Sequence, residues 1–246
     1  MQPVVEGHTI ITMRALALIT ARGGSKGLLG KNLRPVGGVT LVGRAVTTVT
    51  TASKSWPDGL DVFLSTDSTE IAAAVPPECR PHRLRPASLA SDTATSMEVV
   101  LYELRMARQE GNDYSAVLLL QPTSPLVSAE DLLALLRILS SKEAESALLV
   151  TENEHPVEWL YRLDEANRVV PLFPEAAPTR RQDTIRTYRP LGVEAATSAF
   201  IDRTGALSVS HESRAVPIPA ERAVDIDSAL DLAFCELLLR GAEPSV

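Results

Sequence analysis

Short apolar runs that alternate with longer amphipathic segments constrain the fold of this chain most strongly. Runs of strand length occur at residues 16–19, 62–64, 117–120 and 147–150. Segments with helical spacing occur at residues 41–53, 95–109, 129–139 and 228–239. Thr95, Ser128 and Ser228 are suitable N-caps for three of these helices. Because strands that alternate with helices indicate βαβ units, we predict an α/β fold with a mainly parallel, doubly wound sheet.

The loop that follows the first apolar run is rich in glycine and in positive charge. It reads Ala21-Arg22-Gly23-Gly24-Ser25-Lys26-Gly27-Leu28-Leu29-Gly30-Lys31-Asn32. Its glycines let backbone N–H groups approach an anion closely, and Arg22, Lys26 and Lys31 add positive charge. The glycine spacing fits neither the P-loop motif nor the dinucleotide fingerprint. We therefore predict a polyphosphate site of another kind; the alternative is a flexible loop whose charges are incidental.

Two acids near the C-terminal helix are spaced for a shared cation. Asp225 and Asp227 lie two residues apart in an expected extended stretch, so both carboxylates point to one face. Such oxygen ligands suit Mg²⁺, which we predict as the cofactor. The alternative is that Asp227 belongs to a capping turn with Ser228 and that Asp225 is a solvated surface acid. Asp67 follows an expected strand and could either lie near a bound nucleotide or cap the helix that begins near Thr69; we favour the cap.

Net charge and cysteine content narrow the possible partners. The 246 residues include 24 Lys and Arg against 31 Asp and Glu, a net charge of −7, which argues against a diffuse basic surface for nucleic acid. Two cysteines offer neither a disulfide framework nor a Cys-based zinc site, as expected for a reducing, cytoplasmic location. The apolar runs are too short to span a bilayer. We expect neither a nucleic-acid partner nor a membrane partner.

The domain organisation follows from where the periodic pattern stops. Residues 1–13 are expected to form an N-terminal extension, and residues 14–246 the main domain. Residues 153–189 are rich in proline and charge and lack a clean periodicity, which indicates an insertion. The chain contains no internal repeat, so a solenoid is excluded.

Five motifs occur in a fixed order along the chain. They are the glycine-rich loop, STDS at residues 65–68, LRPASLASDTATS at 84–96, LLLQPTSPL at 118–126 and DIDSALDL at 225–232. In this combination the chain resembles the acylneuraminate cytidylyltransferases (CMP-sialic acid synthetases) over about residues 14–240. The resemblance implies a nucleotide-diphospho-sugar-transferase-like, Rossmann-like fold whose small insertion pairs two subunits into a homodimer. It also implies Mg²⁺-dependent transfer of CMP from CTP to the hydroxyl of a sialic-acid-like sugar acid, with release of pyrophosphate.

The same resemblance assigns roles to individual residues. Arg22 and Lys31 are expected to face the triphosphate, and Arg22 to stabilise charge on the α-phosphoryl group and the leaving group. The other expected nucleotide contacts are Ala21, Gly23, Gly24, Ser25, Asn32, Arg85 and Ser96. The acceptor is expected to contact Gln121, Arg181 and Arg189. Arg181 has an alternative interpretation as part of a solvated, charged turn.

On the acceptor side, the chain departs from the pattern of sialic-acid enzymes at Val127, Glu158, Leu191 and Ala195. The resemblance places Leu191 where an amide is usual, Ala195 where an aromatic is usual, and Glu158 where a lysine can occur. Two like charges about 4 Å apart repel by about 4 kcal/mol at an effective dielectric near 20. We therefore expect an acceptor other than plain N-acetylneuraminate.

Two other functions remain open from the sequence. One is a nucleotidyltransferase that acts on another acceptor, such as a sugar phosphate or a phosphonate. The other is a non-catalytic CTP-binding subunit. Arg22 and the pair Asp225 and Asp227 favour an enzyme, since a protein that only binds nucleotide has little need of both features.

Overall fold

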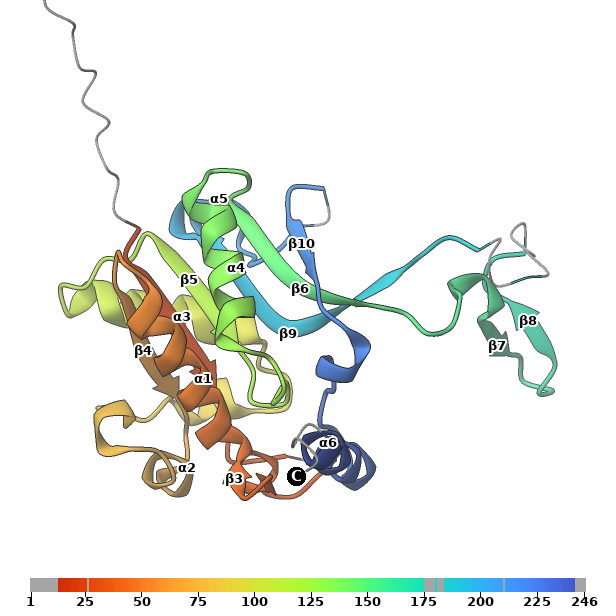
Figure 1. The fold of residues 1–246 in the computed structure, drawn as a ribbon, viewed down its shortest axis with the longest axis horizontal. Coiled ribbons are helices and arrows are strands. Elements are labelled where there is room, and N and C mark those ends of the chain that lie inside the picture. The colour runs from red at the N-terminus through yellow and green to blue at the C-terminus, as the bar shows by residue number, and fades with distance from the viewer. Residues whose placement is uncertain (1–12, 26, 175–179, 181–183, 210, 242–246) are drawn as a thin grey trace, which may run out of the picture.

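The computed structural model describes residues 13–25, 27–174, 180, 184–209 and 211–241. Its centre is a six-stranded sheet in the order β10-β6-β9-β5-β1-β4 (Figure 1). β9 runs antiparallel to β5 and β6, while the other neighbouring strands are parallel. The expected mainly parallel sheet is therefore confirmed, with one antiparallel strand near its middle.

The predicted strands and helices all form, with small differences at their ends. The strands of the main sheet are β1 (Ala15–Thr20), β4 (Leu60–Ser65), β5 (Ala116–Leu120), β6 (Ser146–Glu152), β9 (Tyr188–Thr197) and β10 (Arg214–Pro217). The helices are α1 (Leu41–Ser55), α2 (Thr69–Ala73), α3 (Ser96–Gln109), α4 (Ala129–Ser140), α5 (Ser198–Thr204) and α6 (Ala229–Gly241). Two short hairpins consist of β2 (Pro35–Val36) with β3 (Val39–Thr40), and of β7 (Tyr161–Leu163) with β8 (Val169–Pro171).

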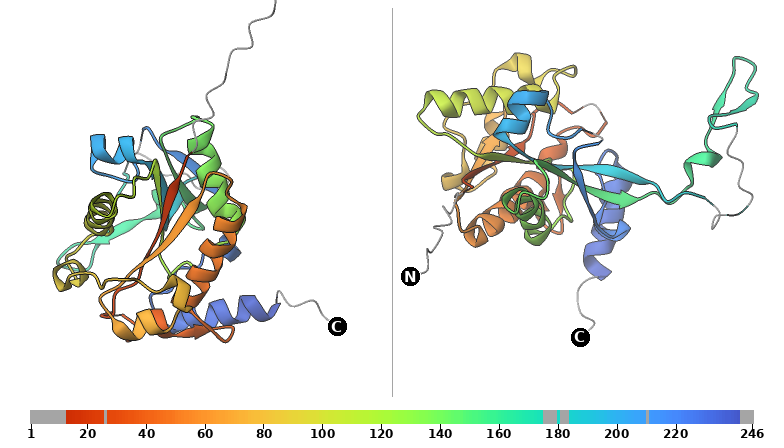
Figure 2. Two further views of the ribbon diagram at one scale, coloured as in Figure 1. Left: turned by 90° about the vertical axis from the view of Figure 1, so that its left-hand side faces the viewer. Right: turned by 90° about the horizontal axis from the view of Figure 1, so that it is seen from above.

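Helices cover both faces of the sheet (Figure 2). α1 and α4 pack on one face, over a core that includes Leu118 and Leu149. α3 and α5 pack on the other face, around Leu18 and Phe200. α6 lies beyond the carboxyl ends of the parallel strands and buries Cys235 in a third, smaller core. Within the described part of the chain, no helix has both the length and the apolar character that crossing a membrane requires.

The helices begin where the expected N-caps stand. Thr95 forms a capping box with Glu98 at the start of α3, and Ser128 forms one with Asp131 at the start of α4. At α6, the Ser228 hydroxyl accepts a hydrogen bond from the Asp231 backbone N–H at 3.3 Å. Such caps satisfy backbone donors that the first helical turn leaves free. The three predicted caps are confirmed.

The expected insertion at residues 153–189 carries the hairpin β7–β8, which projects away from the sheet (Figure 1). The hairpin turns at Asn167, whose φ of 59° is in the left-handed region that asparagine tolerates. The last two residues of the expected insertion already belong to β9. The insertion is thus an outgrowth between two neighbouring strands of the main sheet, β6 and β9.

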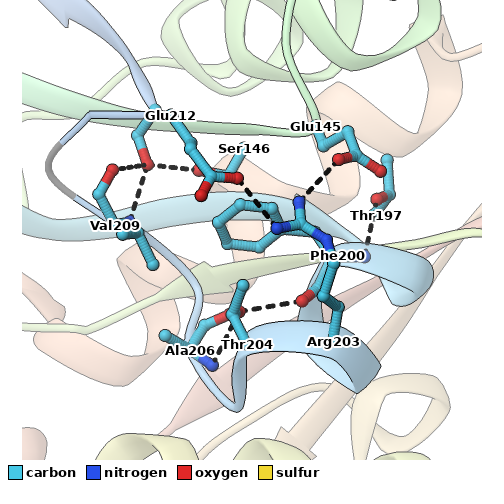
Figure 3. A network of polar contacts seen from close by, with 10 residues as sticks. Glu145, Ser146, Thr197, Phe200, Arg203, Thr204, Ala206, Val209 and Glu212 are labelled. Carbon is cyan, nitrogen blue, oxygen red and sulfur yellow. Dashed lines mark hydrogen bonds and ion pairs between the residues drawn. The ribbon is translucent and has the colours of Figure 1, made fainter.

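A polar network fixes α5, which the sequence pattern did not predict, to the sheet (Figure 3). The Thr197 hydroxyl caps α5 by accepting from the Phe200 N–H at 3.1 Å. Arg203 donates to Glu145 at 2.7 Å and to Glu212 at 2.9 Å. Its guanidinium also lies 5.1 Å from the centre of the Phe200 ring. These contacts join α5 to the residues that precede β6 and β10, at the opposite edge of the sheet from the carboxyl ends of β1 and β5.

Candidate active site

A cavity of about 460 Å³ lies at the carboxyl ends of β1 and β5. Open α/β sheets bind ligands at this edge. Four stretches of chain line the cavity: the loop after β1, the loop before α3, the loop after β5 and the turn before α6. Among the lining residues are Arg22, Ser25, Lys31, Asn32, Arg85, Asp92, Ser96, Gln121 and Asp227. Most of the residues that the sequence assigned to catalysis and to the nucleotide therefore meet here.

Arg22 bridges two loops that meet at the cavity. Its Nη1 donates to the backbone oxygen of Ser91 at 2.8 Å, and its Nη2 lies 3.0 Å from Oδ1 of Asp92. The side chains of Arg22 and Asp92 are 33% and 47% exposed, so water and salt reach the ion pair. The guanidinium is thus held at the cavity by a partner that an incoming anion can replace.

Lys31 and Asp227 form a second ion pair at the cavity, with Nζ 2.9 Å from Oδ1. The lysine side chain is mostly buried, whereas the carboxylate is exposed. The backbone N–H of Asp227 donates to Asp231 at 3.0 Å, so Asp227 also belongs to the turn that caps α6. The capping role and the role at the cavity are compatible, because the backbone serves one and the carboxylate serves the other.

Asp67 fastens the glycine-rich loop and does not cap a helix. The backbone N–H of Gly23 donates to Asp67 Oδ1 at 2.9 Å. Ser68 caps α2, because its hydroxyl accepts from the Ile71 N–H at 3.2 Å. Our expectation that Asp67 is the cap is therefore wrong. The reason is tertiary: β1 and β4 are adjacent parallel strands, so the residues that follow them meet.

Only part of the glycine-rich loop lines the cavity. Ala21 is fully buried in the core, Gly23 binds Asp67, and Gly24 faces solvent outside the cavity lining. Ser25, which was expected at the site, lines the cavity together with Gly27, which was not. A Cβ at Gly27 would lie only 2.9 Å from the backbone oxygen of Asp227, so glycine permits this close approach. The expected contacts of Ala21, Gly23 and Gly24 with the nucleotide stay predictions.

Asn32 holds the glycine-rich loop in its turn. It is nearly buried, and its Nδ2 donates to the backbone oxygen of Arg22 at 2.9 Å. This hydrogen bond joins the two ends of the loop. Asn32 therefore sets the position of Arg22 as well as lining the cavity.

Arg85 is a deeply buried cation in the cavity wall. Its side chain is 4% exposed, and its Nη2 lies 3.9 Å from Oδ1 of Asp67. Burial lowers the pKa of Arg85, although the nearby carboxylates of Asp67 and Glu103 oppose this effect. Its Nε has no hydrogen-bond partner among the described residues. Arg85 itself lines the cavity, and a guanidinium there is suited to an oxygen acceptor of a ligand.

Ser96 and Gln121 meet where α3 begins and β5 ends. The side-chain Nε2 of Gln121 donates to the Ser96 hydroxyl at 3.2 Å. Ser96 is an expected nucleotide contact, and Gln121 is an expected acceptor contact. The contact therefore brings the two predicted halves of the site together.

Besides Ala21, Gly23 and Gly24, three predicted site residues are not among those that line this cavity. Arg189 lines a neighbouring cavity of about 460 Å³, where its Nη2 donates to the Ala223 backbone oxygen at 2.9 Å. Asp225 is exposed and lines neither cavity. Arg181 lies outside the described residues. The segment 223–227 separates the two cavities, since Ala223 lines the second and Asp227 lines the first.

The four departures from the sialic-acid pattern lie outside both cavities. Val127, Leu191 and Ala195 are buried in the core shared by α1 and α4. Leu191 and Ala195 belong to β9, a central strand whose neighbours are β5 and β6, so their side chains pack against helices. Glu158 is buried in the insertion, where it accepts from the Ile185 N–H at 3.2 Å. None of the four residues lines either cavity, and the expected exclusion of N-acetylneuraminate stays a prediction.

Sequence reasoning missed the two contacts that shape the loop: Asp67 with Gly23, and Asp92 with Arg22. The order of the strands was the missing signal. Once β1 is placed next to β4, a carboxylate in STDS is expected near the glycine-rich loop.

Comparisons with known proteins agree with this geometry. Residues 16–198 match the family model described as cytidylyltransferase. A pseudaminic acid cytidylyltransferase from Campylobacter jejuni is 26% identical over 233 residues, which cover 93% of this chain and 97% of that protein. A CMP-N,N′-diacetyllegionaminic acid synthase from Legionella pneumophila is 40% identical over 119 residues, 48% of this chain and 50% of that protein.

Among solved structures, a CMP:2-keto-3-deoxy-manno-octonic acid synthetase complexed with CTP has the same fold, with a TM-score of 0.65 and 15% identity over 93% of this chain and 99% of that one. A 4-diphosphocytidyl-2C-methyl-D-erythritol synthase from Anaerococcus prevotii has a TM-score of 0.61 and 14% identity over 94% and 98% of the two chains. These likenesses confirm the expected Rossmann-like α/β fold. The family match spans most of the main sheet and its cavity. The chain belongs to the cytidylyltransferase family of nucleotidyltransferases.

Proposed function

We propose that this enzyme transfers CMP from CTP to the hydroxyl of a nonulosonic sugar acid and releases pyrophosphate. The observation that carries the proposal is the cavity at the ends of β1 and β5, where Arg22, Lys31 and Arg85 converge. The relatives from Campylobacter jejuni and Legionella pneumophila, whose names specify pseudaminic and diacetyllegionaminic acids, support this class of acceptor.

The protein's part in this reaction is to position CTP and to stabilise charge. Phosphoryl-type transfers require little covalent chemistry from protein side chains. In the proposal, the triphosphate replaces Asp92 as the partner of Arg22, and Lys31 contacts the phosphates from the other side of the loop. Arg22 then stabilises the charge that develops on the α-phosphoryl oxygens and on pyrophosphate. Arg85, which lines the same cavity, binds an oxygen of the nucleoside through its guanidinium.

The carboxylates before α6 fit a magnesium ion that the nucleotide brings with it. Ile226 is buried, whereas Asp225 and Asp227 on either side of it are exposed. Among the described residues, no group of three or more His, Cys, Asp or Glu is arranged to hold a metal. Mg²⁺ commonly keeps waters and takes one or two carboxylates plus phosphate oxygens, so these two acids suffice. When bound, Mg²⁺ neutralises phosphate charge.

The acceptor is proposed to lie between Gln121 and the second cavity. Arg189 supplies a positive charge there, and Asn153 and His155 line the same cavity. A sugar acid offers a carboxylate to such a guanidinium and hydroxyl or acylamino groups to neutral side chains. The reacting hydroxyl of the sugar acid must reach the cavity that Arg22 lines, which lies beside the cavity that Arg189 lines.

We also propose that the enzyme is a cytoplasmic homodimer that pairs through the insertion. The hairpin exposes large apolar side chains, including Tyr161, Leu163 and Val169, which are 56%, 60% and 61% exposed. A continuous apolar surface of this kind is typical of an interface. Light scattering after gel filtration tests the dimer, and Leu163→Asp combined with Val169→Asp is expected to give a monomer. Both cysteines are free thiols, which supports a reducing compartment.

The proposal is tested by mixing the enzyme with CTP, Mg²⁺ and one of three acceptors: pseudaminic acid, N,N′-diacetyllegionaminic acid or N-acetylneuraminate. Pyrophosphate and the CMP adduct are expected with at least one acceptor. Arg22→Ala is expected to lower kcat by about 10²- to 10³-fold, as for loss of one donor to a developing anion. Arg105→Ala, on the exposed side of α3, is the matched control.

Three outcomes would contradict the proposal in different ways. Tight CTP binding without pyrophosphate release from any acceptor points to the non-catalytic subunit. Turnover with a sugar phosphate or a phosphonate alone points to the other nucleotidyltransferase function. If Asp227→Ala leaves Mg²⁺-dependent turnover unchanged, the proposed metal ligands are wrong.

A further inference from the structure

The side chain of Gln121 is confined between α3 and β9. Its backbone N–H donates to the Gly192 oxygen at 2.9 Å, which continues the pairing of β5 with β9 beyond Leu120. Its side-chain Nε2 donates to the Ser96 hydroxyl at 3.2 Å. These two bonds fix Gln121 at both ends, one through its backbone and one through its amide.

Gly192 leaves just enough room for this side chain. A Cβ at residue 192 would lie 2.6 Å from Gln121 Oε1, 2.7 Å from Cδ and 3.0 Å from Cβ. Directly opposed Cβ atoms on neighbouring strands normally lie about 4.5–5.5 Å apart. Gly192 does not have a positive φ, so the strand conformation itself would accept any residue. The requirement for glycine is therefore the space that Gln121 occupies.

β9 cannot readily move away to make that space. Leu191 and Val193, on either side of Gly192, are 5% and 0% exposed and pack in the main core. The strand is hydrogen-bonded to β5 at Gly192 and Val193, and it pairs with β6 at residues 188–190 and 194–196, on either side of an irregularity in the register. Because interiors are closely packed, a side chain at residue 192 would displace Gln121 rather than the strand.

We propose that Gly192 is a positioning residue that fixes the Gln121 amide and thereby selects the acceptor. This inference rests on the proposed function, in which Gln121 contacts the sugar acid. An amide carries two N–H donors and one carbonyl acceptor, and a single donor is used on Ser96. The other N–H and the carbonyl can bind a hydroxyl or an acylamino group, which are neutral groups of the acceptor.

The test is a double-mutant cycle of Gly192→Ala, Gln121→Ala and the two together. Gly192→Ala is expected to raise the KM for the acceptor about tenfold, comparable to the loss of one hydrogen bond, and to change the CTP dissociation constant less than about twofold. Gln121→Ala is expected to have a similar effect, and the double variant to be no worse than Gln121→Ala alone. Gly241→Ala is the matched control, because a Cβ there meets nothing within 4 Å.

Folding provides a second measurement that needs no acceptor. Gly192→Ala is expected to lower the melting temperature, and the double variant to recover part of that loss, since Gln121→Ala removes the atoms that overlap most. In the NMR spectrum, the Gln121 side-chain amide signals are expected to shift in Gly192→Ala.

The inference would be overturned if Gly192→Ala left the KM for the acceptor unchanged. It would also be overturned if the double variant raised this KM by the product of the two single effects. Unchanged Gln121 amide signals would overturn it as well. If the wild-type enzyme uses none of the three acceptors, the proposed function fails, while the stability cycle and the amide signals still decide whether Gly192 positions Gln121.

Discussion

Replacing Asp92 with asparagine is expected to tighten CTP binding, because Asp92 and the triphosphate use the same guanidinium. Oδ1 of Asp92 lies 3.0 Å from Nη2 of Arg22, and both side chains are partly exposed. Exposed ion pairs contribute about 0.2–1 kcal/mol, so freeing Arg22 is expected to lower the CTP dissociation constant about 1.4- to 5-fold. Removal of a negative charge beside the phosphates acts in the same direction.

Isothermal titration with CTP and Mg²⁺ at about 50 and 500 mM salt measures this effect. The gain in affinity is expected to shrink at high salt, because the Debye length falls well below 10 Å. Asp113→Asn is the matched control for the change in net charge, since Asp113 is 90% exposed and lies 3.9 Å from the Arg108 guanidinium. Weaker CTP binding by Asp92→Asn would refute the reasoning, because Asp92 would then help to bind the nucleotide.

Three further predictions concern stability and reactivity. Burial raises the pKa of Asp131, but hydrogen bonds from Arg222 and from its helix cap outweigh this effect and leave the pKa below its usual value. The ionised carboxylate therefore stabilises the fold above about pH 4, and this stabilisation is lost as the pH falls further. In urea unfolding, Asp131→Asn is expected to lower the free energy of unfolding by about 1.5–3 kcal/mol at pH 7 and by much less near pH 3. Burial raises the pKa of the Cys235 thiol to about 11, so a thiol reagent is expected to label the less buried Cys79 in the native protein and Cys235 only after unfolding. Phe200→Ala is expected to cost about 3–5 kcal/mol in the same unfolding assay, because that ring is fully buried.

The sequence predicted the elements that depend on local signals. The buried run of β1, the capping boxes at Thr95 and Ser128 and the glycine-rich loop are each encoded in contiguous residues. It missed β9, although β9 is the longest strand and lies near the middle of the sheet. Pro190, Gly192 and Glu194 weaken its β-propensity, and pairing with β5 and β6 decides its conformation.

The sequence predicted most of the residues that line the cavity, but it did not predict the contacts between them. Arg22, Lys31, Arg85 and Gln121 do meet, as the motifs indicated. The errors arose where the partner is far away in sequence. Asp67 binds a loop 44 residues earlier, and a local motif cannot separate this role from a helix cap. Side chains alternate between the two faces of β9, so Leu191 packs in the core and Gly192 lies beside Gln121.

The most direct test of the central claim, that the cavity at the ends of β1 and β5 binds CTP, is thermal unfolding with CTP, UTP, ATP and GTP, each with Mg²⁺. A nucleotide at 100 times its dissociation constant stabilises the fold by about 2.7 kcal/mol, which corresponds to roughly 5–11 °C in a chain of this size. We expect this shift with CTP alone, and its loss in Arg22→Ala. An equal shift with all four nucleotides, or none with CTP, would contradict the claim.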